Sequence, residues 1–144
     1  MVRRLQLLFS FLQFIPDLIW GTRAINDLQR LTVSLRGGFE QRAKCQLFRF
    51  TGQLDTYSDK QFVEFLGAHR QGSKPLLIDL THIDCIDSSG LGALVQLAKH
   101  CQDEKQRFLV VGNARVKQTV KLVRLEEFLH LQPDLNTALG SITA

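Results

Sequence analysis

The sequence predicts an α/β fold: a mixed sheet of four to five strands with parallel central strands, about four helices, and an extra helical segment at the N-terminus. Short apolar runs, as at residues 76–78 and 107–112, alternate with segments in which apolar residues recur every three or four positions. Such alternation implies right-handed crossovers and a mostly parallel sheet. The length of 144 residues fits one domain. We place this domain at residues 31–144, after an amphipathic extension at residues 1–30.

The extension differs in composition from the rest of the chain. Its polar residues fall on one narrow helical stripe, and nearly everything else from residue 5 to residue 20 is apolar. Pro16 should kink or end this helix, and the stretch is too short and too interrupted to span a bilayer. No small-residue cleavage site of a secretory signal follows. Three interpretations remain: weak contact of residues 1–20 with a membrane surface, docking on the domain or a partner, or an upstream extension from a misassigned start.

The domain is predicted to begin with two antiparallel strands. Residues 31–35 alternate in polarity and predict an edge strand that ends at Gly37-Gly38. Residues 46–52 predict the second strand, after a loop that contains residues 40–44. A first helix follows, with Phe62, Phe65 and Leu66 on its apolar face, and ends before Gly72.

The central stretch, residues 76–99, predicts a buried strand, a polar loop and a helix that begins at a pair of serines. Residues 76–78 are apolar, as in a strand covered on both faces. Asp87, Ser88 and Ser89 all suit the N-cap position. Gly90 and Gly92 are poor helix formers, so we expect something to approach the backbone closely there.

A serine hydroxyl at this helix N-terminus can tolerate a phosphate, because unpaired N–H groups and the helix dipole favour negative charge. The carboxylates of Asp84 and Asp87 would oppose a phosphate. Phosphorylation would therefore change the electrostatics of this spot sharply.

The remaining elements continue the alternation. Residues 107–112 predict a buried strand, and residues 115–124 a helix with Val116, Val120 and Val123 facing inward. Its basic residues suggest a solvated face: Arg115, Lys117, Lys121 and Arg124. Residues 128–131 predict a short last strand, and Pro133 starts a terminal helix.

The stretch IDSSGLGALVQL, residues 86–97, resembles the signature of the STAS family, the anti-sigma factor antagonist domains of bacteria. In that family the first serine of D-S-[ST]-G-L-G is phosphorylated by a partner kinase that is itself the anti-sigma factor. By position this serine is Ser88. GQLD, residues 52–55, resembles the family's G-x-L-D element, whose aspartate lies close to the phosphorylated serine. Asp55 would equally serve as a helix cap.

The resemblance covers about the last three quarters of the chain and implies a non-enzymatic signalling domain in the cytoplasm. Unphosphorylated, it would bind an anti-sigma factor serine kinase; phosphorylated at Ser88, it would release the kinase. ATP and Mg²⁺ would belong to the kinase, and a PP2C-type phosphatase would restore the serine. The switch loop implied by the resemblance comprises Asp55, Asp84, Asp87, Ser88, Ser89, Gly90, Leu91 and Gly92. Two alternatives within the family are a structural subunit of a lipid-handling ABC transporter complex and a nucleotide-binding module.

Charge and motif content count against other function classes. Residues 45–144 carry eleven basic and eleven acidic residues, so the domain is neutral and we predict no nucleic-acid partner. Neither the four histidines nor the three cysteines have metal-ligand spacing: His69, His82, His100, His130, Cys45, Cys85 and Cys101. We expect reduced thiols. The S-S-G-L-G sequence differs from the hydrolase pattern G-x-S-x-G, so we predict no catalytic residues, metal or cofactor.

Overall fold

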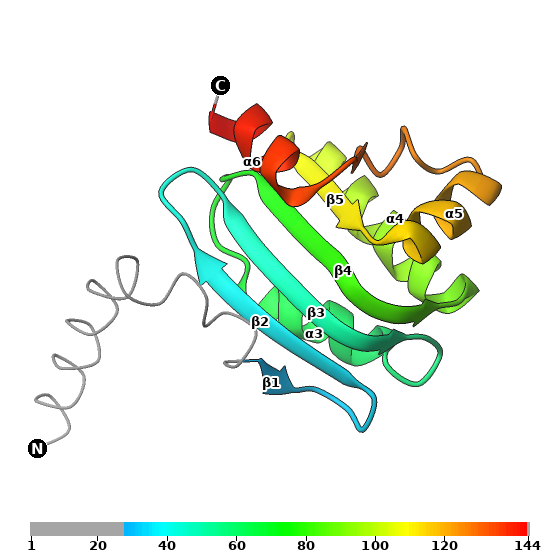
Figure 1. Ribbon diagram of the computed structural model, residues 1–144. Helices are drawn as coiled ribbons and strands as arrows, with labels where there is room; N and C mark the ends of the chain where they lie inside the picture. The colour runs from blue at the N-terminus through cyan, green and yellow to red at the C-terminus, as the bar shows by residue number, and fades with distance from the viewer. Residues whose placement is uncertain (1–27, 144) are drawn as a thin grey trace, which may run out of the picture.

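The computed structural model describes residues 28–143, and these form a mixed six-stranded sheet packed with helices (Figure 1). The strands follow the chain order across the sheet. The elements are β1 (Gln29–Arg30), β2 (Leu35–Gln41), β3 (Gln46–Leu54), α3 (Asp59–His69), β4 (Leu76–Ile86), α4 (Ser88–Asp103), β5 (Phe108–Gly112), α5 (Ala114–Leu122), β6 (Leu131–Gln132) and α6 (Leu135–Thr143). The predicted α/β class is confirmed. The predicted N-terminal helical segment lies outside the described residues.

Pairing in the sheet is antiparallel from β1 to β3 and parallel from β3 to β6. The antiparallel pair β2–β3 and the parallel central strands are therefore confirmed. Two strands of only two residues each, β1 and β6, bring the count above the four to five expected. Because β1 pairs with β2, the sheet begins at Gln29, two residues before the predicted start of the domain.

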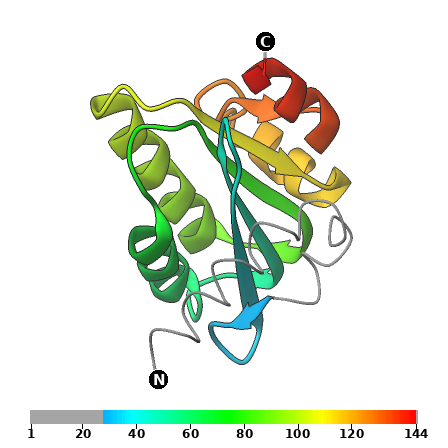
Figure 2. The same ribbon diagram turned by 90° about the vertical axis from the view of Figure 1, so that its left-hand side faces the viewer.

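Helices α3 and α4 lie side by side on one face of the sheet, and α6 lies on the other (Figure 2). The larger hydrophobic core fills the space under α3, α4 and α5, with Phe48, Phe50 and Leu94 fully buried. A smaller core beneath α6 consists of Leu47, Leu77, Leu109, Val111 and Ala138. Alternate residues of β3, β4 and β5 supply the two cores, as the two-residue period of a strand requires.

The position predicted for the first long strand is wrong. β2 does not end at Gly37-Gly38 but runs through both glycines to Gln41. A Cβ atom on Gly37 would lie 2.9 Å from a methyl carbon of Leu31 and 2.9 Å from a ring carbon of Phe50. Glycine is needed here because these two side chains pack over the strand, not because the strand stops. The loop that follows is accordingly shorter than predicted, at residues 42–45.

The polar loop predicted after Ile78 is also wrong, because β4 continues to Ile86. Residues 76–79 pair with both β3 and β5, whereas beyond Leu80 the strand pairs with β3 alone, with register shifts. Polar side chains are tolerated in this second half because His82 and Asp84 are exposed. As a result, β3 and β4 end side by side, at Leu54 and Ile86.

The C-terminal elements match the prediction with shifted ends. Val116 and Val120 of α5 are buried as expected, but Val123 is 50% exposed because the helix ends at Leu122. The last strand is Leu131–Gln132 rather than residues 128–131. Helix α6 begins two residues after Pro133.

Candidate functional site

The N-terminus of α4 is capped by Asp87, one of the three residues that the sequence offers for the N-cap position. Asp87 has an extended backbone (φ −108°), and its carboxylate accepts a 2.9 Å hydrogen bond from the N–H of Gly90. The N–H of Asp87 donates to the carbonyl of Leu54 at 3.2 Å. The cap therefore ties the start of α4 to the end of β3, and Ser88 becomes the first residue of the helix.

The second carboxylate oxygen of Asp87 reaches a different segment of the chain. It accepts hydrogen bonds from the N–H of Thr56 at 3.2 Å and from the Thr56 hydroxyl at 3.3 Å. Burial raises the pKa of Asp87, but the hydrogen bonds from Gly90, Thr56 and the N–H of Ser89 outweigh it and hold the pKa below its ordinary value. The cap is therefore a carboxylate anion at neutral pH.

The two serines of the motif have different surroundings. Ser88 is exposed, and its hydroxyl makes no hydrogen bond to another described residue. Ser89 is half-buried, and its hydroxyl lies 3.0 Å from the hydroxyl of Thr56. Of the two hydroxyls, that of Ser88 is the one open to a partner.

The two glycines of the motif also differ. A Cβ atom on Gly90 would lie 2.4 Å from the carbonyl oxygen of Leu54, which confirms the expected close approach to the backbone. A Cβ atom on Gly92 would meet nothing within 4 Å. Leu91, between them, points its side chain into the larger core. Packing within the domain therefore explains why glycine is required at position 90, but it does not explain the glycine at position 92.

Asp55 lies next to the site without contacting the serines. Its carboxylate accepts hydrogen bonds from the N–H of Tyr57 at 2.9 Å and from the Ser58 hydroxyl at 3.2 Å. The N-cap of α3 is Ser58, so the alternative in which Asp55 caps that helix is wrong. Asp55 instead shapes the turn that presents Thr56 to Asp87.

Asp84 is exposed on β4, and its carboxylate makes no hydrogen bond or ion pair with another described residue. Its carbonyl oxygen accepts a 2.9 Å hydrogen bond from Arg115 of α5. No contact links Asp84 to the serines. Asp87 is thus the carboxylate that the described residues bring to the serines.

A shallow groove runs between α3 and α4 and reaches the second serine of the motif. Its lining is mixed in charge and comprises Asp59, Lys60, Val63, Glu64, Ser89, Gly92, Ala93 and Gln96. Two large apolar side chains stand exposed on the α3 side: Val63 is 45% exposed, and Tyr57, in the preceding turn, is 85% exposed. Exposed apolar side chains beside a groove are typical of protein-binding surfaces.

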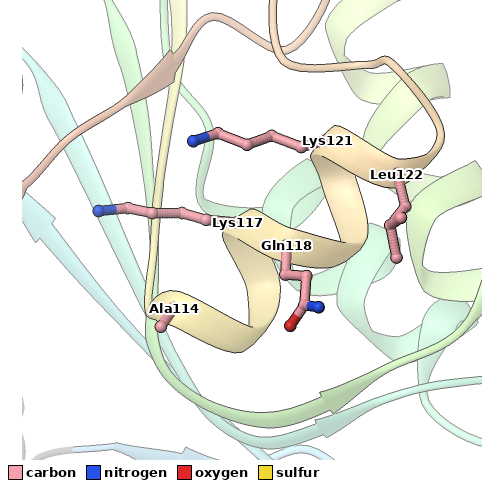
Figure 3. Close-up of a pocket in the computed structure, with 5 residues that line it drawn as sticks. All are labelled: Ala114, Lys117, Gln118, Lys121 and Leu122. Carbon is pink, nitrogen blue, oxygen red and sulfur yellow. The ribbon is translucent and has the colours of Figure 1, made fainter.

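A second hollow lies along α5, lined by Ala114, Lys117, Gln118, Lys121 and Leu122 (Figure 3). Two of the four basic side chains of this region are held by backbone carbonyls. Arg115 donates to Asp84, and the ammonium group of Lys117 donates to Pro133. Arg115, Lys121 and Arg124 are exposed and Lys117 is half-buried, in agreement with the expected solvated face.

Within residues 28–143, no three His, Cys, Asp or Glu side chains gather in a way that could hold a metal ion. In the same range no helix has the length and apolar character needed to cross a bilayer. Burial raises the pKa of the Cys45 and Cys101 thiols, whereas Cys85 is exposed.

The sequence prediction missed Thr56. Its contacts to Asp87 and Ser89 span 31 and 33 residues of chain, so no local pattern reveals them. The available signal was its position directly after GQLD, the element expected near the serine. Asn113 was missed in the same way: its side-chain amide donates to the carbonyls of Thr81 and Ile83.

The chain is similar to a known protein family and to known sequences. The STAS domain profile matches residues 39–138 of this chain. The anti-sigma-B factor antagonist of Staphylococcus aureus (strain NCTC 8325 / PS 47) is 27% identical over 82 residues, which cover 56% of this chain and 76% of that protein.

Solved structures share the fold. The crystal structure of an anti-sigma factor antagonist from Mycobacterium paratuberculosis matches with a TM-score of 0.70 and 24% identity, covering 77% of this chain and 96% of that one. The structure of the anti-sigma factor antagonist SpoIIAA in its unphosphorylated form matches with a TM-score of 0.61 and 16% identity. The match covers 74% of this chain and 96% of that one.

Proposed function

The chain belongs to the STAS domain family, and from this premise we propose that it is an anti-sigma factor antagonist controlled by phosphorylation of Ser88. Unphosphorylated, it binds an anti-sigma factor serine kinase and so releases a sigma factor. Phosphorylated, it lets the kinase go. The domain supplies the acceptor hydroxyl and the docking surface, whereas ATP and Mg²⁺ are brought by the kinase. A PP2C-type phosphatase resets the cycle, which runs in the cytoplasm.

The observation that carries the proposal is the state of Ser88. Its hydroxyl is exposed and free of hydrogen bonds to described residues, and it sits in the first turn of α4. The dipole of α4 can offset part of the charge of a phosphate at its N-terminus. The fold should therefore accept the modification.

Release of the kinase follows from charge. A phosphate on Ser88 carries about −1.5 to −2 charges at neutral pH and stands next to the Asp87 anion. Like charges brought together at an interface can cost several kcal/mol. The modification therefore changes the surface offered to the partner more than it changes the fold.

The groove between α3 and α4 supports a docking surface for the kinase beside Ser88, because its lining includes the neighbouring Ser89. Tyr57 and Val63 provide exposed apolar anchors, and Asp59, Lys60 and Glu64 provide a charged rim. A kinase that holds Ser88 at its active site would cover this groove with the same face.

The test uses Ser88→Asp and Ser88→Ala with the GHKL-type kinase recovered on the wild-type protein from native extract. Ser88→Asp should bind at least about tenfold more weakly, a loss of about 1.4 kcal/mol. Ser88→Ala should keep binding, and both should melt close to wild type. Ser73→Asp is the matched control, because it adds the same charge in the exposed loop between α3 and β4. This loop precedes β4, whereas Ser88 follows it, so the two serines lie at opposite ends of the strand.

Intact mass and phosphopeptide mapping complete the test. We expect one phosphate, on Ser88. A folded Ser88→Asp protein that binds the kinase like wild type, or a phosphate found on Ser89 instead, would contradict the proposed mechanism.

A further inference from the structure

The hydroxyl of Thr56 lies between the anion of Asp87 and the hydroxyl of Ser89. It is 3.3 Å from the Asp87 carboxylate and 3.0 Å from the Ser89 hydroxyl. The N–H of Thr56 also donates to Asp87, at 3.2 Å, which fixes the threonine backbone against the cap. One side chain from the β3–α3 connection thus contacts two members of the DSSGLG motif.

The direction of these hydrogen bonds follows from the number of protons available. A carboxylate has no proton to give, so the Thr56 hydroxyl donates to Asp87. A hydroxyl has only one proton, so toward Ser89 the Thr56 oxygen can only accept. A bond to an anion is also stronger than one to a neutral hydroxyl, which favours this direction over its reverse. The proton of Ser89 therefore points at Thr56, and that of Thr56 at Asp87.

We propose that Thr56 is a positioning residue that selects between the two adjacent serines: by accepting the proton of Ser89 it leaves Ser88 as the phosphate acceptor. This inference rests on the proposed phosphorylation of the site. In that step a serine oxygen bonds to the γ-phosphorus of ATP, and the bond from this phosphorus to the β,γ-bridging oxygen breaks. ADP leaves with the electron pair, and the serine proton passes to a base of the kinase.

Ser88 and Ser89 differ in what this step requires. Ser89 must first break its bond to Thr56, and its proton faces the interior of the network rather than an incoming base. Ser88 has no such bond to break. The selection therefore depends on a side chain outside the serine motif.

The first test needs no kinase and measures the Asp87 titration by carboxyl-carbon NMR on the full chain. Thr56→Val removes the donor hydroxyl at nearly constant shape, so the pKa of Asp87 should rise, whereas Thr56→Ser should restore it. Ser89→Ala should leave the pKa of Asp87 close to wild type. If Thr56 instead donated to Ser89, Ser89→Ala would lower this pKa and Thr56→Val would barely change it, which would overturn the inference. Asp134, the aspartate at the start of α6, is the internal reference, because the N–H of Thr137 also lowers its pKa.

The second test measures phosphorylation in a Ser88→Ala background, with labelled ATP and the kinase captured on the wild-type protein. The double variant Ser88→Ala/Thr56→Val should take about tenfold more label on Ser89 than Ser88→Ala alone. Ser88→Ala/Thr56→Ser should not. If wild type is labelled on Ser88 but the double variant gains nothing, the role of Thr56 is wrong while the proposed function stands. If wild type takes no label, the proposed function fails, and the inference with it.

Discussion

Helices α4 and α5 begin in the same way, and the comparison of their first turns separates what holds the fold from what is offered to a partner. Each follows a parallel strand and starts at an extended Asp or Asn residue. The side-chain oxygens of Asp87 and Asn113 each accept a 2.9 Å hydrogen bond from the N–H three residues on. The two caps thus satisfy the same requirement of a helix N-terminus.

The rest of each cap is used differently. The amide of Asn113 donates inward to the carbonyls of Thr81 and Ile83, in the part of β4 that has no partner on the β5 side. The second carboxylate oxygen of Asp87 accepts from Thr56, near the surface. Asp87 is followed in the sequence by the stretch SSGLG, with two serines and two glycines. The N-cap of α5 therefore stabilises the sheet (the fastening junction). The N-cap of α4 instead places a carboxylate and the Ser88 hydroxyl near the surface, where a partner can contact them.

The largest effect on stability is expected at the fastening junction. Asn113→Ala removes an N-cap, worth about 1 kcal/mol, and leaves two β4 carbonyls without their donor, at about 1–3 kcal/mol for a buried group. We expect a loss of about 2–4 kcal/mol in the free energy of unfolding, measured in urea. Asn113→Ser keeps the cap oxygen but not the amide, so it should fall between Asn113→Ala and wild type. If both variants unfolded like wild type, Asn113 would not be fastening β4.

Gly90→Ala should have the next largest effect. Its methyl group would meet the backbone carbonyl of Leu54, which cannot move without shifting the end of β3. Overpacking of this kind costs about 1–3 kcal/mol. A melting temperature equal to that of wild type would show that β3 and α4 can separate freely.

Part of the fold could be predicted from the sequence, and part depends on contacts that only the folded chain makes. Local periodicity and cap preferences predict the alternation of strands and helices, the inward face of α3 and the serine motif at a helix start. Gly37 was mistaken for a strand end because its glycine requirement comes from Leu31 and Phe50, which only the folded sheet brings over it. Residues 79–86 were mistaken for a loop because several of their polar side chains are exposed and because, beyond Leu80, the strand pairs with β3 alone.

The site itself was predicted only in part. Asp87, Ser88 and Gly90 could be found from sequence, because a cap, a first-turn residue and a close approach lie within four positions. The connection through Thr56 could not, since it depends on β3 and β4 ending side by side. Nor could the separation of Asp84 from the serines, which follows from the extension of β4 to Ile86.

Asp87→Asn tests the charge that distinguishes the two caps. The amide oxygen can still accept from Gly90, but the amide NH2 cannot accept from Thr56, so the loss at neutral pH should exceed the about 0.3–1 kcal/mol of a charge at a helix N-terminus. The pKa of Asp87 is lower folded than its ordinary value of 3.8, so its contribution is present above that pH and is lost as the pH falls through the folded pKa. Urea unfolding from pH 7 to pH 3 should therefore show the variant approaching wild type in acid. A constant difference across this range would contradict the argument.

Gly92→Ala should have a small effect on stability, of the opposite sign. A Cβ atom at this exposed helical position meets nothing within 4 Å, so alanine should stabilise the fold by roughly 0.5–1 kcal/mol. Gly67→Ala is a matched control, because it is also exposed, helical and free of contacts at Cβ, but lies outside the groove between α3 and α4.

The two alanine variants should therefore melt slightly above wild type and differ only in binding. If the kinase approaches the backbone of α4 along the groove, the methyl group of Gly92→Ala should weaken binding while Gly67→Ala leaves it unchanged. Binding of both variants at wild-type strength would mean that the partner does not approach Gly92, and that the glycine costs the helix stability without a role in docking. Weaker binding of Gly92→Ala would instead show that the partner-binding surface of α4 extends from Ser88 by one helical turn into the groove. Substitutions in the first turn of α5 should not weaken binding in this way.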